Sequence, residues 1–123
     1  MKIEDIRFRG RTKDGEWAYG DLVHLPKERV GIGGSLLCVE VDPNTVGQYT
    51  GRKDKDGKEI YEGDIIADKK DDLYKVVWMK TGMYELHGIK RGKGSFYKFV
   101  GLPAWLSKEA RVVGNIHDEG GLI

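Results

Sequence analysis

Acidic side chains are the first candidates for chemistry in this sequence, because two neighbouring carboxylates can act as a general acid and a general base. Glu40 and Asp42 form one such pair, and Asp64 and Asp68 form another. Both pairs border apolar runs, and nothing in their spacing distinguishes them from the solvated carboxylates that are common at strand ends. We therefore expect no catalytic residues and predict that the chain is not an enzyme.

Metal ligands and activated nucleophiles are also poorly represented. The histidines, His24, His87 and His117, lie far apart, and Cys38 is the single cysteine, so the close ligand spacing of a structural zinc site is absent. Residues 54–57 resemble the middle of a calcium loop, but in that register glycine and arginine would occupy both end-ligand positions. The sequence predicts no metal and no cofactor.

Two glycine-rich segments fail the tests for phosphate binding. Residues 31–35 read Gly-Ile-Gly-Gly-Ser, but leucine stands where a dinucleotide fingerprint needs its third glycine. Residues 91–95 read Arg-Gly-Lys-Gly-Ser, and glycine follows the lysine where a phosphate loop requires serine or threonine. Both segments are better explained as turns.

A basic, aromatic stretch between residues 86 and 108 is the least generic feature. It contains five basic and no acidic residues, and aromatic residues are interleaved with the lysines. Small β-proteins bind single-stranded nucleic acid by stacking bases on aromatic rings beside a positively charged groove. The candidate binding surface consists of Lys90, Arg91, Lys93, Tyr97, Lys98 and Trp105. The alternative is that strand alternation buries part of the aromatic set while the lysines only solvate the outer face.

The composition describes a water-soluble chain without a targeting segment. The 123 residues carry a net charge of +1, which favours no particular partner, and no apolar run approaches the roughly 20 residues of a membrane helix. Charged residues at positions 2, 4, 5 and 7 interrupt the apolar core that a signal peptide needs. We expect a cytoplasmic protein that does not bind membranes.

Alternation and glycine content predict the elements that position these side chains. Short apolar or alternating runs at residues 6–9, 17–25, 36–41, 64–68, 73–79, 84–89, 96–100 and 112–117 predict strands, and eighteen glycines suit tight turns between them. Only residues 103–111 have helical composition. The fold class is therefore all-β with one short helix, in a small barrel-like or SH3-like architecture.

An internal similarity suggests how the chain is organised. Residues 13–23 and 55–66 each contain an Asp-Gly pair, then an aromatic residue, then Gly-Asp before an apolar run. Asp-Gly favours a tight hairpin turn, because glycine readily adopts a positive φ. We predict a single domain over residues 1–123, with two abutting β subdomains, 1–50 and 51–123, as the alternative.

Several segments together resemble the YopX family of phage and prophage proteins. They are residues 6–10, 16–22, 46–65 and 113–117, and the middle segment reads Thr-Gly-x-x-Asp-x-x-Gly-x-x-Ile-x-x-Gly-Asp from Thr50 to Asp64. Residues 68–110 match the family only loosely. The resemblance implies a β-rich accessory protein in the cytoplasm of a bacterial host, and it brings no known activity, cofactor or catalytic residue.

Two binding hypotheses follow. The first is a non-enzymatic module that binds a host or phage protein, or a second copy of itself as a homo-oligomer, since exposed strand edges make such association easy. The second is a nucleic-acid-binding module that uses the basic, aromatic stretch at residues 90–108.

Overall fold

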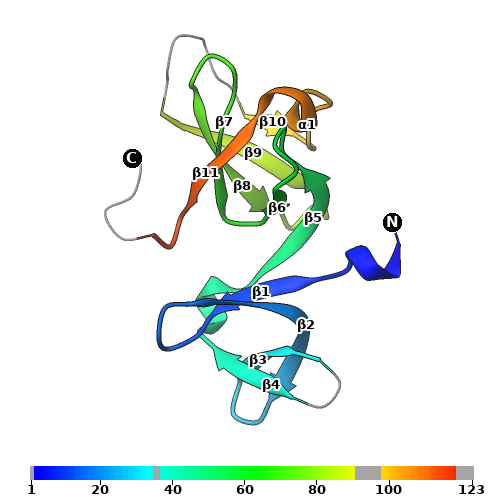
Figure 1. Cartoon of the computed structure of the whole chain (residues 1–123), viewed down its shortest axis with the longest axis vertical. Helices are drawn as coiled ribbons and strands as arrows, with labels where there is room; N and C mark the ends of the chain where they lie inside the picture. The colour runs from blue at the N-terminus through cyan, green and yellow to red at the C-terminus, as the bar shows by residue number, and fades with distance from the viewer. Residues whose placement is uncertain (1, 35–36, 91–97, 119–123) are drawn as a thin grey trace. The chain divides into compact units, whose positions relative to one another are not determined.

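The protein consists of two antiparallel sheets, seen in a computed structural model that describes residues 2–34, 37–90 and 98–118 (Figure 1). The strand orders are β4-β3-β2-β1-β5-β6 and β10-β9-β8-β7-β11. Both sheets are open in the part of the chain that the structure describes, and neither closes into a barrel. The predicted all-β class with one short helix is confirmed.

Two compact units divide the chain: unit 1 is Met1–Gly51 and unit 2 is Arg52–Ile123. The predicted subdomain boundary, between residues 50 and 51, lies next to this division. Within the described residues, no helix is long and apolar enough to cross a bilayer.

In unit 1, the first four strands form an antiparallel meander, and the fifth returns to pair with the first. Its elements are η1 (Ile3–Asp5), β1 (Phe8–Arg11), β2 (Trp17–Leu25), β3 (Arg29–Gly33), β4 (Cys38–Val41), η2 (Pro43–Thr45) and the start of β5 (Gly47–Lys53). β1 pairs with both β2 and β5, and β4 lies at the edge of the sheet beside β3.

Gly10 marks the point where β4 approaches β1. A Cβ atom on Gly10 would lie 2.7 Å from Cγ2 of Val41, which is buried, so only glycine allows this contact. Immediately afterwards, the amide of Asp42 donates a 2.9 Å hydrogen bond to the carbonyl of Arg11. The end of β4 is thereby held against the end of β1.

The opposite face of β1 carries arginines that lie over aromatic rings. The guanidinium of Arg7 is 4.7 Å from the centroid of Tyr49, and those of Arg9 and Arg11 are 4.2 and 4.6 Å from Trp17. Arg7 directly precedes β1, and the three arginines stand at every second position, so their side chains share one face. Cation–π contacts therefore fix the face of β1 that points away from Val41.

Unit 2 contains the larger hydrophobic core. Its elements are β6 (Glu59–Tyr61), β7 (Asp64–Ala67), β8 (Leu73–Trp78), β9 (Tyr84–Lys90), β10 (Phe99–Val100), α1 (Leu106–Glu109) and β11 (Arg111–Asn115). The core consists of Ile60, Ile66, Tyr74, Val76, Leu86, Leu106 and Ala110. Buried and partly exposed residues alternate along β8, as its sequence pattern predicts.

The two Asp-Gly sequences form hairpin turns with the same hydrogen bonds. The amide of Thr12 donates to the carbonyl of Glu16, and Asp54 donates in the same way to Lys58. Gly15 and Gly57 have φ values of +84° and +82°, in the left-handed region that favours glycine. The hairpin interpretation of both sequences is confirmed.

Two aspartates of the Thr50–Asp64 segment have structural roles. Asp54 is buried and accepts from three backbone amides, those of Asp56 and Lys58 at Oδ1 and that of Val112 at Oδ2, each at 2.9 Å. Asp64 is also buried and accepts a 2.8 Å hydrogen bond from the amide of Tyr61. Hydrogen bonds that fix the backbone thus explain why aspartate stands at these two positions of the segment.

The helix and three strands differ from the predictions. α1 is a single turn, because Ala110 is already extended, with ψ near 154°, and its carbonyl accepts from Lys55. β3, β5 and β6 were not predicted. β3 contains two glycines, which disguise its alternation, whereas β5 and β6 flank the Asp-Gly turn of unit 2.

Candidate functional site

The predicted basic, aromatic surface lies only partly within the described residues. Arg91, Lys93 and Tyr97 are outside them, and Lys90 is the last residue of β9. Lys98 is exposed, with its ammonium 3.7 Å from Oε1 of Glu85. This surface stays a prediction.

Glu85, on β9, is a buried carboxylate beside this stretch. Its Oε1 lies 2.9 Å from Nε2 of His87, and this hydrogen bond is the main reason that the pKa of Glu85 is lowered. Burial acts in the opposite direction, and the charge of Lys98 lowers the pKa further. Lys98 is therefore the outer member of a local ionic cluster.

Trp105 belongs to an aromatic cluster that packs on the core of unit 2. Its ring centroid is 5.6 Å from Phe99 and 6.1 Å from Tyr74, and Tyr74 is 5.7 Å from Phe99. The three rings line a small cavity of about 210 Å³. Trp105 is only partly exposed, so much of its surface is used in packing.

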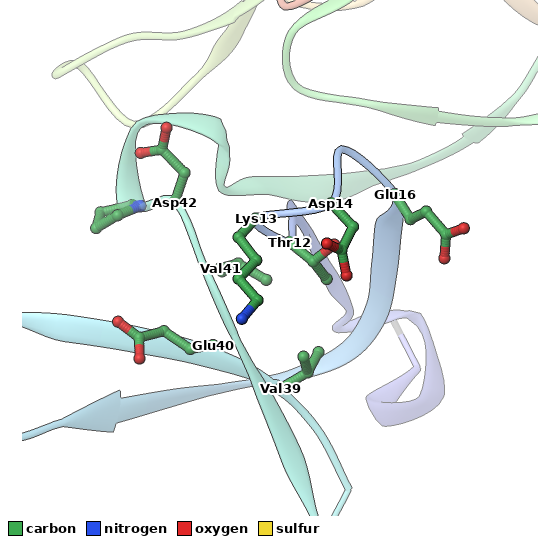
Figure 2. A pocket seen from close by; sticks show the side chains of 9 residues that line it. Thr12, Lys13, Asp14, Glu16, Val39, Glu40, Val41 and Asp42 are labelled. Atoms are coloured by element: carbon green, nitrogen blue, oxygen red, sulfur yellow. The ribbon is translucent and has the colours of Figure 1, made fainter.

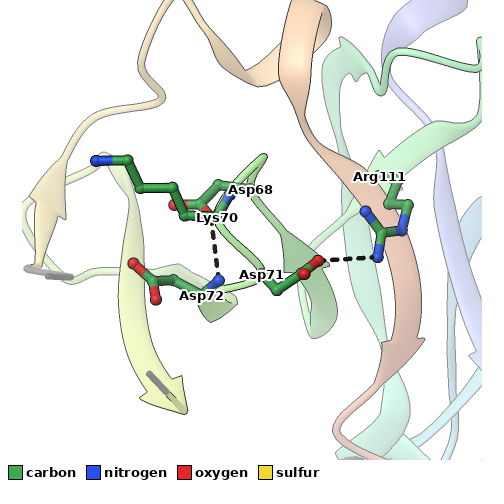
Figure 3. Close-up of polar contacts among 5 residues, drawn as sticks. All are labelled: Asp68, Lys70, Asp71, Asp72 and Arg111. Atoms are coloured by element: carbon green, nitrogen blue, oxygen red, sulfur yellow. Dashed lines mark hydrogen bonds and ion pairs between the residues drawn. The ribbon is translucent and has the colours of Figure 1, made fainter. Parts of the chain in front are cut away.

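The carboxylates considered for catalysis in unit 2 organise backbone turns. Oδ1 of Asp68 accepts from the amides of Lys70 and Asp72 at 2.8 and 3.0 Å, while Asp71 forms a 3.3 Å ion pair with Arg111 (Figure 3). Asp68 thus stabilises the connection between β7 and β8. Asp64, as described above, has a similar role.

A groove of about 740 Å³ in unit 1 is lined by two of the candidate carboxylates, Glu40 and Asp42 (Figure 2). One side is the turn between β1 and β2, and the other is β4 with the start of η2. Its lining residues are Thr12, Lys13, Asp14, Glu16, Val39, Glu40, Val41, Asp42 and Pro43. Its volume is typical of ligand-binding clefts.

The groove is acidic with an apolar strip. Asp14, Glu16, Glu40 and Asp42 supply four carboxylates, and Lys13 is the single basic residue in the lining. Val39 is 44% exposed and supplies apolar surface to the groove. The groove is thus suited to a partner that brings positive charge and some apolar surface.

The groove brings together Glu40 and Asp42, one of the two predicted carboxylate pairs. Glu40 forms a 3.0 Å ion pair with Arg29, and Oδ1 of Asp42 accepts from the amide of Asn44 at 3.0 Å. Both carboxylates are exposed to water. Exposed carboxylates of this kind can attract a cationic partner.

Sequence reasoning missed the groove because its two sides are distant in the chain. Residues 12–16 and 39–43 meet only because β1 to β4 curl until Asp42 reaches Arg11. The alternation of Val39 and Val41 with Glu40 and Asp42 was a usable signal of a half-exposed strand.

Within the described residues, no cluster of three or more histidine, cysteine, aspartate or glutamate side chains could hold a metal ion.

The fold and the groove define a small all-β protein with an acidic cleft beside an edge strand. A family model described as YopX protein matches residues 7–123, nearly the whole chain. The chain therefore belongs to the YopX family, as its sequence motifs indicated. No curated protein sequence gives a significant match.

Proposed function

We propose that this chain is a non-enzymatic binding protein that holds a cationic segment of a partner protein in the acidic groove of unit 1. The observation that carries the proposal is the groove itself, with four carboxylates around an exposed strip of β4. Opposite charge attracts such a segment, and the exposed valine offers apolar contact at the same place.

The biological setting of the proposal comes from the YopX family. We propose an accessory protein of a bacteriophage or prophage that acts in the cytoplasm of the bacterial host, where its partner is a host or phage protein. The β4 strand of a second copy is a less suitable occupant of the groove, because it would bring Glu40 and Asp42 of the two copies together.

The test is the binding of fluorescent seven-residue peptides, measured by anisotropy at low and moderate salt. We use a lysine- and valine-containing peptide, a glutamate- and valine-containing peptide, and a single-stranded oligonucleotide. Only the cationic peptide should bind, and its binding should weaken with salt. Binding of the oligonucleotide alone would instead support the nucleic-acid hypothesis, and a concentration-dependent dimer in light scattering would support self-association.

The contribution of the groove is tested by the double variant Asp14→Asn/Glu16→Gln. Loss of two exposed ion pairs should cost about 0.4 to 2 kcal/mol, a weakening of about 2- to 30-fold. The matched control is Asp56→Asn, since Asp56 is exposed at the corresponding position of the second Asp-Gly turn and lies outside the groove. Equal weakening by the control, or none by the double variant, would refute the proposal.

A further inference from the structure

We infer that the groove takes its partner as an added β-strand along β4, and that the preferred segment alternates cationic and β-branched apolar residues. This inference rests on the proposed function, because it specifies how the same groove recognises its ligand. It depends on the backbone N–H and C=O groups of β4, which have no part in the charge attraction proposed above.

The register of β4 shows which backbone groups point out of the sheet. Gly34 donates to the carbonyl of Leu37 at 2.9 Å, and the pairs Ile32↔Val39 and Gly31↔Glu40 follow in the same register. Hydrogen-bonded and non-hydrogen-bonded pairs alternate in an antiparallel ladder. Val39 therefore bonds to β3, whereas the N–H and C=O groups of Glu40 point away from β3, toward the edge of β4 that no other described strand pairs with.

The next outward-pointing residue confirms this direction. Asp42 follows Glu40 by two residues, and its amide donates to Arg11 of β1 rather than to β3. The end of β1 thus covers the edge at Asp42, after which β1 leads into the turn at residues 12–16. At Glu40 the edge faces the groove, because Glu40 lies in the groove lining.

The side chains of β4 set the pattern of the added strand. Val39 and Glu40 lie on opposite faces of the strand, and both are exposed. An added strand would bring one set of alternate side chains beside Val39 and the other beside Glu40. Apolar contact favours a β-branched residue in the first set, and opposite charge favours lysine or arginine in the second, where the added cation would share Glu40 with Arg29.

The first test compares backbone-methylated forms of the alternating peptide Lys-Val-Lys-Val-Lys-Val-Lys. Alternate amides of an added strand face β4, and the others face solvent. We make one peptide N-methylated at the valines and another at the internal lysines. One of the two should bind at least 10-fold more weakly than the parent, while the other binds nearly as well. Equal binding by both methylated peptides would overturn the inference.

The second test acts on the edge strand. Glu40→Pro removes the outward N–H. No hydrogen bond to β3 is broken, because this N–H points away from β3, and proline is tolerated at such edge positions. Glu40→Gln is the matched variant, since it removes the same charge and keeps the amide. The proline variant should bind the parent peptide about 2- to 13-fold more weakly than the glutamine variant, the effect of one hydrogen bond. Equal affinities would contradict strand addition.

A third peptide separates the two proposals. Lys-Lys-Val-Val-Val-Lys-Lys has the same composition as the parent but lacks alternation. If it binds as tightly as the parent and still depends on Asp14 and Glu16, the groove binds cations without strand addition, and only this inference fails. If neither peptide binds, the proposed function itself fails. If the proline variant does not fold, as judged by circular dichroism, the methylated peptides still decide the question.

Discussion

Replacement of Asp54 offers the sharpest test of how the Thr50–Asp64 segment stabilises unit 2. Its carboxylate accepts three backbone hydrogen bonds of 2.9 Å, two within the turn at residues 54–58 and one from Val112 on β11. Asp54→Ala removes all three acceptors. The turn amides belong to exposed residues and can bond to water, whereas the amide of Val112 is only partly exposed.

The expected loss can be summed from these contacts. Each turn hydrogen bond should contribute about 1 kcal/mol, and the bond from Val112 to a charged acceptor about 1.5 to 3 kcal/mol. Asp54→Ala should therefore lower the free energy of unfolding by about 4 kcal/mol. Asp54→Asn keeps one oxygen acceptor for the turn and presents an amide group to Val112, so it should cost about 2 kcal/mol.

Urea denaturation followed by circular dichroism measures these differences. Asp56→Ala is the control, because Asp56 is exposed at the same turn and should change stability by less than about 0.5 kcal/mol. Amide hydrogen exchange at Val112 reports the third hydrogen bond directly and should accelerate in both Asp54 variants. A loss below about 1 kcal/mol for Asp54→Ala, with unchanged protection of Val112, would refute this account of the segment.

Two further predictions concern packing and pH. Gly10→Ala should destabilise the protein by about 1 to 3 kcal/mol in urea denaturation, because its Cβ would meet Val41, whereas Gly34→Ala has open space and should be near neutral. Burial, with a smaller contribution from a nearby carboxylate, raises the pKa of Tyr84 to about 12. Since the unfolded chain ionises near pH 10, stability should fall as the pH rises from 10 to 12, and Tyr84→Phe should reduce this fall; a wild-type slope in that variant would contradict the assignment.

Bounded apolar runs made part of the fold predictable from sequence. β2 and β8 were expected at nearly their observed limits, because Pro26 ends the first run and Asp71 and Asp72 precede the second. The helix was overestimated because its composition could not reveal that residue 110 pairs its carbonyl with Lys55, far away in the chain. Local pattern fails where a long-range hydrogen bond decides the conformation.

The candidate site was less predictable than the fold. A contiguous run of charge, as at residues 90–108, is visible in sequence, and it directed attention to Lys98 and Trp105. The groove instead depends on the contact between Asp42 and Arg11, which joins segments about thirty residues apart. These acidic residues have no distinctive pattern in the sequence, and they form a site only because the folded sheet brings residues 12–16 and 39–43 together.

The hydrogen bond between Asp54 and Val112 also sets an order in which the chain can fold during synthesis. The strand pairs of unit 1 join residues that all precede position 52, so this unit can complete its pairing early. The turn of unit 2 lacks one of its three amide donors until residue 112 has left the ribosome. We therefore expect vectorial folding, in which unit 1 forms first and β11 completes unit 2.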